Sequence, residues 1–257
     1  MTFDQIIAIA NDLAASAAAA AALAAARGTF LVVKQMQRQI IASYQPELTF
    51  TRVLITGSAQ GESWPIPSSW HEGEQTLAQD THSDKLVAIE PKLKLFNIGL
   101  GAAVNIHIDW DFPIEHFIKQ INILAQKALI ANYIEFIPPG LINFKSEIWK
   151  VNSSSIWGNQ KSESTDYILS GNTQKVETSL TLPYAIRELV SSYIYFWFIQ
   201  KSDNKTRFLN IPSLKAIISY NDIDGVVFDI SFNFNFLSLD KEGLLMFTLY
   251  LTPKKIK

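Results

Sequence analysis

Two histidines and two glutamates in one polar stretch are of the types that bind metal ions. Imidazole nitrogens and carboxylate oxygens are both ligands that zinc accepts. The spacing of these residues matches none of the recurrent zinc patterns, so we expect a solvated loop without a metal ion. The four residues are His71, Glu72, Glu74 and His82.

Paired carboxylates are a second chemical possibility. Asp109 and Asp111 are two residues apart, a spacing that places both on one face of a strand. Two carboxylates that are buried together can act as general acid and base. Because the pair stands near a strand end before Pro113, we expect both side chains to be solvated.

Two short segments share part of a ligand-binding loop. Gly99–Val104 (GLGAAV) has two glycines of a dinucleotide-binding loop, but Val104 occupies the third glycine position and a strand follows instead of a helix. Asp222–Gly225 (DIDG) begins like a calcium loop but lacks the further oxygen ligands. We expect a turn between strands at the first segment and a hairpin turn at the second, with no cofactor at either.

The composition excludes several functional classes. The chain has 257 residues, of which 48% are hydrophobic and 18% charged, and this is too apolar for a disordered chain. A net charge of −2 gives no field that would hold nucleic acid, and the absence of cysteine removes thiol nucleophiles and disulfides. The chain contains no Ser/His/Asp order, nucleophile elbow or phosphate-binding loop, so we do not expect an enzyme.

The amino-terminal segment is rich in alanine. Every residue from Leu13 to Ala26 is Leu, Ala or Ser, a composition that favours a helix. A helix over Ile6–Val33 is roughly 42 Å long and therefore crosses a hydrocarbon layer of ~30 Å. The apolar side chains favour insertion by a few kcal/mol, which Asp12 and Arg27 offset in large part. The sequence predicts a transmembrane segment of marginal hydrophobicity.

Basic residues follow this segment instead of preceding it. Arg27, Lys34 and Arg38 come late, whereas a cleaved signal peptide carries its basic residues first. The positive-inside rule then predicts a single-pass protein of the inner (cytoplasmic) membrane, with the following domain in the cytoplasm.

Polar residues of the helix fall on one face. At 100° per residue they lie within a sector of about 60°, which we call the polar stripe. Facing stripes predict a homo-oligomer or a pore, since small residues let membrane helices approach closely. A lone anchor with tolerated end charges and a soluble helix packed on the rest of the protein remain alternatives. The polar stripe consists of Gln5, Asp12, Ser16, Arg27 and Lys34.

A domain boundary is expected near Pro46. The segment Lys34–Tyr44 continues as a polar helical spacer, and Pro46 ends it. Residues 1–45 are therefore expected to form the helix and spacer, and residues 46–257 a β-rich domain.

The pattern of the domain is mainly that of strands, with two helices. One helix follows Pro113 with apolar residues at helical spacing, and another follows Pro183, while Tyr193–Gln200 is compatible with the end of that helix or with a buried strand. The fold expected from this pattern is mainly β (α+β): an antiparallel immunoglobulin-like β-sandwich with two inserted helices. The expected strands are Leu48–Gly57, Lys85–Glu90, Leu93–Ile98, Ala103–Trp110, Ser146–Val151, Asp166–Leu169, Val176–Leu182, Leu214–Tyr220, Val226–Phe236 and Leu244–Leu251, the last ending at Pro253.

A long surface loop is expected over Ser58–Ser83, which is rich in glycine, proline and polar residues. Its residues Trp64, Trp70 and His71 form a candidate surface for a protein partner. The alternative is a loop folded over the core, with Trp64 inserted as a hydrophobic plug.

The order of several segments resembles a widespread group of uncharacterised bacterial proteins. These proteins have one membrane helix and an immunoglobulin-like β-domain, so the resemblance implies architecture and membrane attachment but no activity. This chain differs from the group in its alanine-rich helix, where Leu, Ile and Val are more usual. The segments that carry the resemblance are SYQPEL, LFNIGLGAAVNI, LPYAIRELVSSY and IPSLKAIISYNDIDG.

Three hypotheses for function follow. The first is a non-enzymatic, membrane-anchored interaction or sensing protein that assembles through its amino-terminal helix. The second is a membrane-perturbing, pore-forming effector of a bacterial antiphage defence system. The third is a soluble subunit of a protein complex that uses the helix for packing.

Overall fold

The computed structural model describes residues 3–59, 65–73, 90–130, 133–146, 151–171, 177–200, 209–241 and 246–256. The chain divides into two compact units, Met1–Gln45 and Pro46–Lys257, and we call the second unit the body.

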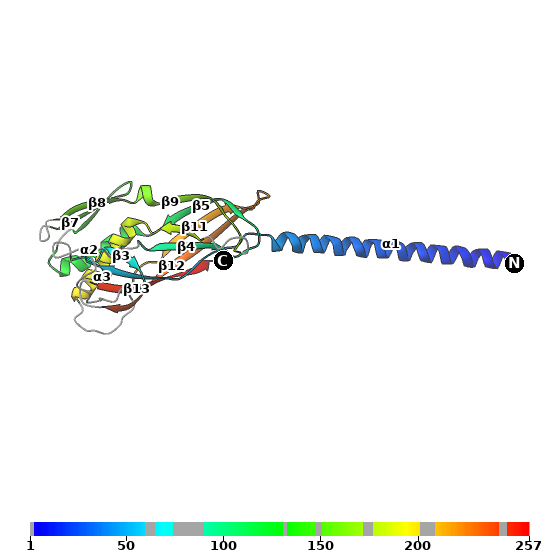
Figure 1. Ribbon diagram of the computed structural model, residues 1–257, viewed down its shortest axis with the longest axis horizontal. Coiled ribbons are helices and arrows are strands. Elements are labelled where there is room, and N and C mark those ends of the chain that lie inside the picture. Colours follow the sequence, from blue (N-terminus) through cyan, green and yellow to red (C-terminus); the bar gives the residue numbers. More distant parts are fainter. Residues whose placement is uncertain are drawn as a thin grey trace, which may run out of the picture. The chain divides into compact units, whose positions relative to one another are not determined.

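The first unit is one continuous helix, α1, from Phe3 to Ser43 (Figure 1). At 1.5 Å per residue its 41 residues span roughly 60 Å. The alanine-rich segment and the polar spacer are therefore parts of the same helix, which extends beyond the Ile6–Val33 range expected from composition. A hydrogen bond from the backbone N–H of Tyr44 to the carbonyl of Ile40 closes the last turn before Pro46.

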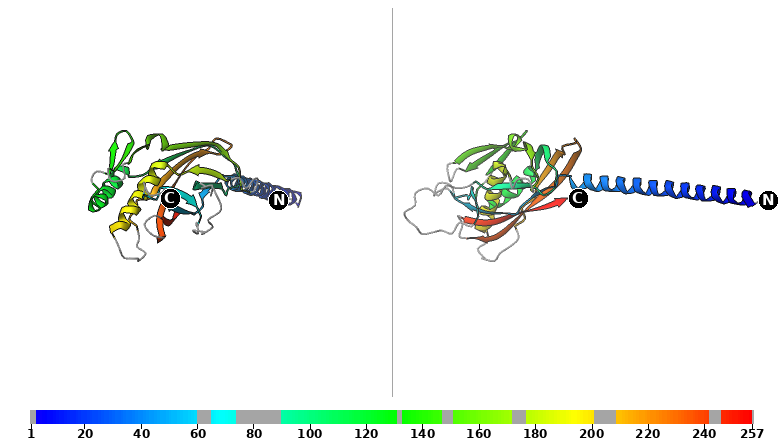
Figure 2. Two further views of the ribbon diagram at one scale, coloured as in Figure 1. Left: turned by 60° about the vertical axis from the view of Figure 1, so that its left-hand side comes forward. Right: turned by 45° about the vertical axis from the view of Figure 1, so that its right-hand side comes forward.

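A curled antiparallel sheet of seven strands dominates the body (Figures 1 and 2). Side chains alternate between core and surface along its strands; in β11 the buried positions are Leu214, Ala216, Ile218 and Tyr220. The strand order is β3-β2-β13-β12-β11-β5-β9. The strands are β2 (Val53–Ser58), β3 (Ser69–Glu72), β5 (Ala103–Asp111), β9 (Ser162–Ile168), β11 (Leu214–Asn221), β12 (Val227–Lys241) and β13 (Met246–Ile256).

Two three-stranded antiparallel sheets complete the β structure of the described residues. One has the order β1-β4-β10, and the other the order β6-β7-β8. Their strands are β1 (Leu48–Phe50), β4 (Lys92–Asn97), β10 (Thr178–Thr181), β6 (Ile134–Ile137), β7 (Leu141–Ser146) and β8 (Val151–Ile156), and a short 3₁₀ turn, η1 (Gly158–Gln160), follows β8.

Two helices of the body pack against each other. The helix α2 (Ile114–Lys127) is amphipathic and buries its apolar face, as its spacing predicts. The helix α3 (Tyr184–Gln200) is buried along most of its length and runs through the body beside the large sheet (Figure 2). Tyr193–Gln200 is thus the end of a helix. The sequence left this open because a buried helix is apolar all round, so its composition resembles that of a buried strand.

Several expected elements differ from the structure. The expected strand Leu48–Gly57 is two strands in different sheets, because the chain passes from one sheet to the other at Thr51 and Arg52. The expected strand Ser146–Val151 is instead the gap between β7 and β8, whose residues 147–150 lie outside the described residues. The expected strand Lys85–Glu90 also lies outside them, except for Glu90, which is not in a strand.

The last strand does not end at Pro253. β13 continues to Ile256, and Phe234 of β12 pairs with Pro253. The pairing of β13 with β2 ends at Leu251, so Pro253 lies on a stretch with one neighbouring strand, where a missing N–H is tolerated.

The expected immunoglobulin-like sandwich is not confirmed. The body is mainly β with antiparallel sheets, but it has one curled sheet of seven strands and two sheets of three. An immunoglobulin domain instead packs two sheets of similar size face to face.

Candidate membrane helix and the network at Pro46

The helix α1 is long and apolar enough to cross a membrane. The segment Leu13–Ile40 contains a stretch of 18 residues with a mean hydropathy of 1.6, and none of that stretch is buried by the described residues of the protein. Its large apolar side chains, among them Leu23 and Phe30, are exposed. Apolar surface of this extent is unfavourable in water, at about 25 cal/mol per Å².

The polar stripe lies on this continuous helix. Because α1 has no break between Phe3 and Ser43, the five stripe positions keep the common face that the 100° periodicity predicts. Arg27 and Lys34 lie within the apolar segment Leu13–Ile40. Asp12 is a residue of α1, but its side chain lies outside the described residues. The hydroxyl of Thr29 donates a hydrogen bond to the carbonyl of Ala25 and is satisfied within the helix.

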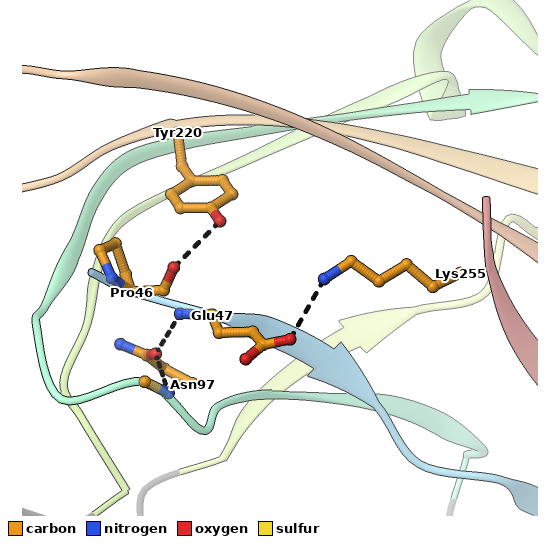
Figure 3. A network of polar contacts seen from close by, with 6 residues as sticks. Pro46, Glu47, Asn97, Tyr220 and Lys255 are labelled. Carbon is orange, nitrogen blue, oxygen red and sulfur yellow. Dashed lines mark hydrogen bonds and ion pairs between the residues drawn. The ribbon is translucent and has the colours of Figure 1, made fainter. Parts of the chain in front are cut away.

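The first residues of the body are held by the buried side chain of Asn97, at the end of β4 (Figure 3). Its Oδ1 accepts hydrogen bonds from the backbone N–H groups of Glu47 and Gly99, both at 3.0 Å. Its Nδ2 donates to the carbonyls of Gly101 and Ile168, at 2.7 and 3.2 Å. One amide therefore joins β1, the β4–β5 turn and the end of β9.

Two further contacts hold the same place. The hydroxyl of Tyr220, on β11, donates to the carbonyl of Pro46 at 3.2 Å. The ammonium of Lys255, on β13, lies 3.3 Å from the carboxylate of Glu47 (Figure 3). We call Pro46, Glu47, Asn97, Tyr220 and Lys255 the Pro46 network. It holds the first two residues of the body to β4, β11 and β13.

The prediction of a surface loop over Ser58–Ser83 is wrong for residues 69–72. These residues form β3, an edge strand of the large sheet, with Trp70 and His71 buried. The indole N–H of Trp70 donates to the Ser191 hydroxyl at 2.7 Å, and burial lowers the pKa of His71. Buried side chains do not present a surface to a partner, so Trp70 and His71 are core residues. Trp64, Glu74 and His82 lie outside the described residues.

The other candidate motifs have structural roles. Oδ1 of Asp222 accepts hydrogen bonds from the N–H groups of Asp224 and Val226, which makes the DIDG segment the turn of the β11–β12 hairpin. Gly99 and Gly101 lie in the turn between β4 and β5. Within the described parts of the chain, no three or more metal-binding side chains come together.

Asp109 and Asp111 are partly solvated, as expected. An oxygen of the Asp109 carboxylate accepts a hydrogen bond from the hydroxyl of Ser162 and lies 3.4 Å from the imidazole of His107. The side chains of His107 and Asp109 are each about half exposed, at 52% and 48%. The Asp109 carboxylate therefore remains in contact with water.

A polar cluster lies along α3 that the sequence analysis did not single out. Glu188 is 3% exposed, and its pKa is raised, chiefly by loss of hydration, against which hydrogen bonds with Tyr184 and Ser68 act. The hydroxyl of Ser192 donates to the carbonyl of Glu188 and lies 3.3 Å from that of Tyr133. A lone glutamate in an otherwise apolar helical run was the signal available for Glu188.

A small open pocket lies beside the first turn of α3. Its volume is about 280 Å³. Arg187 lines it and is bound to Glu90 by an ion pair of 2.7 Å. Glu163 also lines it, and burial raises the pKa of this carboxyl. The guanidinium of Arg187 is already paired with Glu90, and the residues that line the pocket do not favour one class of ligand.

No protein-family model matches the chain, and no curated protein or solved structure matches it either. The resemblance to bacterial proteins with one membrane helix therefore stays an expectation from the sequence.

Proposed function

We propose that this is a single-pass membrane protein in which α1 anchors and assembles the chain, while the β-rich body acts as a non-enzymatic interaction or sensing module. The observation that carries the proposal is the exposed apolar segment Leu13–Ile40 of α1, which none of the described residues buries. A bilayer removes such a surface from water without requiring a partner protein.

The energy of insertion is small and depends on few side chains. Alanine contributes little, so the gain comes from residues such as Leu23, Phe30 and Leu31, at about −0.3 to −0.6 kcal/mol each. A charged residue near the bilayer centre costs about 2.5–3.5 kcal/mol. Arg27 therefore favours an arrangement in which its charge meets water or another helix instead of lipid.

The polar stripe supports assembly for this reason. Copies of α1 that turn their stripes toward one another remove Arg27 and Ser16 from lipid, and the alanines on either side allow close approach. Lys34 and Arg38, near the carboxyl-terminal end of the apolar segment, favour a body on the cytoplasmic side of an inner membrane.

Membrane fractionation of the full chain tests the anchor. We expect the protein to remain in membranes after alkaline carbonate washing. The double variant A25D/V32D should be released, because these two carboxylates lie on the face of α1 opposite the polar stripe and outweigh the gain from the apolar side chains. The control Y44D/Q45D changes charge equally beyond the segment and should stay in the membrane. Recovery of the unaltered protein in the soluble fraction would overturn the proposal and favour a soluble subunit.

Cross-linking in membranes tests assembly. The variant D12L/R27L removes two of the three charges of the stripe and should weaken the oligomer bands. The control N11L/A18L places leucine away from the stripe on the same helix and should leave the bands unchanged. Unchanged bands in D12L/R27L would refute the role of the stripe.

A second candidate function is favoured by the same stripe. If assembled stripes surround water, α1 forms a leak in the manner of a membrane-perturbing effector. Expression of the full chain in bacteria should then depolarise the membrane and arrest growth, and D12L/R27L should be harmless. Normal growth with the unaltered protein in the membrane would refute this candidate.

A further inference from the structure

We propose that the end of the body that carries Pro46 rests in the interfacial layer of the bilayer, with apolar turn residues inserted among the lipid headgroups. This inference rests on the proposed membrane anchoring by α1. Its basis is a group of large apolar side chains that are exposed together at one end of the β structure.

These side chains, which we call the apolar tips, come from two turns and one edge strand. The β4–β5 turn contributes two, the β11–β12 hairpin three and β9 one. All are between 45% and 73% exposed, whereas Phe232, Phe234 and Phe236 of β12 and Ile168 of β9 are buried. The apolar tips are Ile98, Leu100, Tyr167, Ile223, Val226 and Val227.

The strand register places the tips at one end of the body. Val104 pairs with Tyr167 on one side and with Asn221 on the other, and Asn221 pairs with Val227. The backbone N–H of Ile98 donates to the carbonyl of Glu47 at 2.8 Å. The tips therefore surround the start of β1, and Figure 1 shows the β11–β12 hairpin and the start of β1 at the same end of the body.

A short tether keeps this end close to the bilayer. Two residues, Tyr44 and Gln45, separate the end of α1 from Pro46, and the Pro46 network holds Pro46 and Glu47 to three strands of the body. From Ile40, the last residue of the apolar segment, to Pro46 the chain spans at most about 15 Å. The bilayer is thus the large apolar phase that the tips meet first.

Charge plays a minor part in this contact. Lys255 is paired with Glu47, while Asp166 and Asp224 are exposed at the same end. Apolar insertion next to acidic groups is not steered by anionic lipid. We therefore expect the contact to form equally on neutral phosphatidylcholine, with Tyr167 at the level of the headgroups, where tyrosine is favoured.

Single-cysteine labelling tests the inference directly, because the chain has no cysteine of its own. The full-length variants I223C and I98C are labelled with an environment-sensitive fluorophore and reconstituted in phosphatidylcholine vesicles. The control is I123C, an exposed position on α2, which lies at the other end of the body (Figure 1). We expect blue-shifted emission at 223 and 98 and a loss of emission when lipids with shallow nitroxide groups are included, with neither effect at 123.

The outcomes separate this inference from the anchoring proposal. Labels at 223 and 98 that lipid nitroxides do not quench, in protein that resists carbonate washing, would overturn the inference and leave the anchor in place. A blue shift without lipid quenching would also overturn it, because the tips would then be covered by protein. Protein that is washed from the vesicles would overturn the anchor and the inference together.

Discussion

The side chain of Asn97 makes four hydrogen bonds at the Pro46 network. It is 3% exposed and uses both side-chain atoms twice, so its truncation leaves four backbone groups without their partner. Buried polar groups that lose a partner cost about 1–3 kcal/mol each, and water entering the cavity recovers a part.

The variant N97A should therefore destabilise the body by about 3 kcal/mol, which corresponds to roughly 6–12 °C in Tm for a unit of this size. Thermal unfolding followed by near-ultraviolet circular dichroism measures the change. The control N233A removes the same side chain from a half-buried position on β12 and should have a small effect. Equal Tm values for N97A and the unaltered protein would contradict the role assigned to Asn97.

Glu188 makes the stability of the body depend on pH. Burial raises its folded-state pKa above the usual 4.5, so between the two values the folded state holds a proton that the unfolded chain has lost. The stabilising contribution of this group is full below 4.5 and is lost as the pH rises through the raised pKa. Stability should fall accordingly in mildly acidic to neutral solution.

The variant E188Q keeps a hydrogen-bonding amide in place and removes the titration. We expect a smaller loss of Tm in E188Q than in the unaltered protein as the pH rises above 4.5, measured in a series of buffers. The control E135Q removes an exposed carboxyl whose pKa is lowered by Lys145 and should not flatten the profile. A profile of E188Q that follows the unaltered protein would show that Glu188 does not cause the slope.

At the scale of elements, the contact between β2 and β13 depends on a glycine. Gly57 pairs with Phe247, and a Cβ atom at position 57 would overlap the Phe247 ring. That ring also packs edge-on against Trp70, at 5.9 Å between centroids. The glycine thus lets two aromatic residues, from the two strands that flank β2, share one side of the sheet.

The variant G57A should cost about 1–3 kcal/mol through overpacking, because the Phe247 ring must move within a filled core. Chemical denaturation measures this as a lower midpoint with an unchanged slope. The matched control is G158A, where an added Cβ meets nothing within 4 Å. If both variants unfold at the same denaturant concentration, the close approach of Gly57 to the Phe247 ring does not contribute to the stability of the body.

At the scale of the whole molecule, the chain consists of two compact units that differ in how their apolar residues are covered. The body has its own core, whereas α1 has none of its apolar segment buried. Changes that break α1 should consequently affect membrane retention and leave the unfolding of the body unchanged.

The variant A19P tests this independence. Proline in the interior of α1 costs about 3 kcal/mol of helix stability and should release protein from carbonate-washed membranes. The Tm of the body should equal that of the unaltered protein in the same detergent. The control A19L favours insertion and should be retained. A lower Tm in A19P would mean that the body relies on α1 for its stability.

Local sequence patterns predicted the elements whose residues interact with near neighbours. The alanine run predicted α1, Pro113 and helical spacing predicted α2, and strict alternation around the DIDG turn predicted the β11–β12 hairpin. Each of these is stabilised by interactions within a few residues along the chain, so its pattern is complete in a short window.

The elements that were wrong or missed depend on distant partners. Trp70 lies in a segment with the composition of a loop. It is buried because it donates a hydrogen bond to Ser191 and packs against Phe247, and both residues are far away in sequence. Asn97 lay within the expected strand Leu93–Ile98 and its role was missed, since the groups it binds include the carbonyl of Ile168, far away in sequence. No pattern in the expected strand Leu48–Gly57 showed that it serves two sheets.

The sequence by itself thus determined an amino-terminal helix long enough to cross a membrane, the face on which its polar residues lie, and the predominance of antiparallel strands after Pro46. Tertiary structure alone decided the order of the sheets, the burial of β3 and Glu188, and the gathering of exposed apolar turns around the start of β1. The physical reason is that hydrophobic periodicity is a property of neighbouring residues, whereas strand pairing and the satisfaction of buried polar groups are set by contacts between residues far apart in the chain.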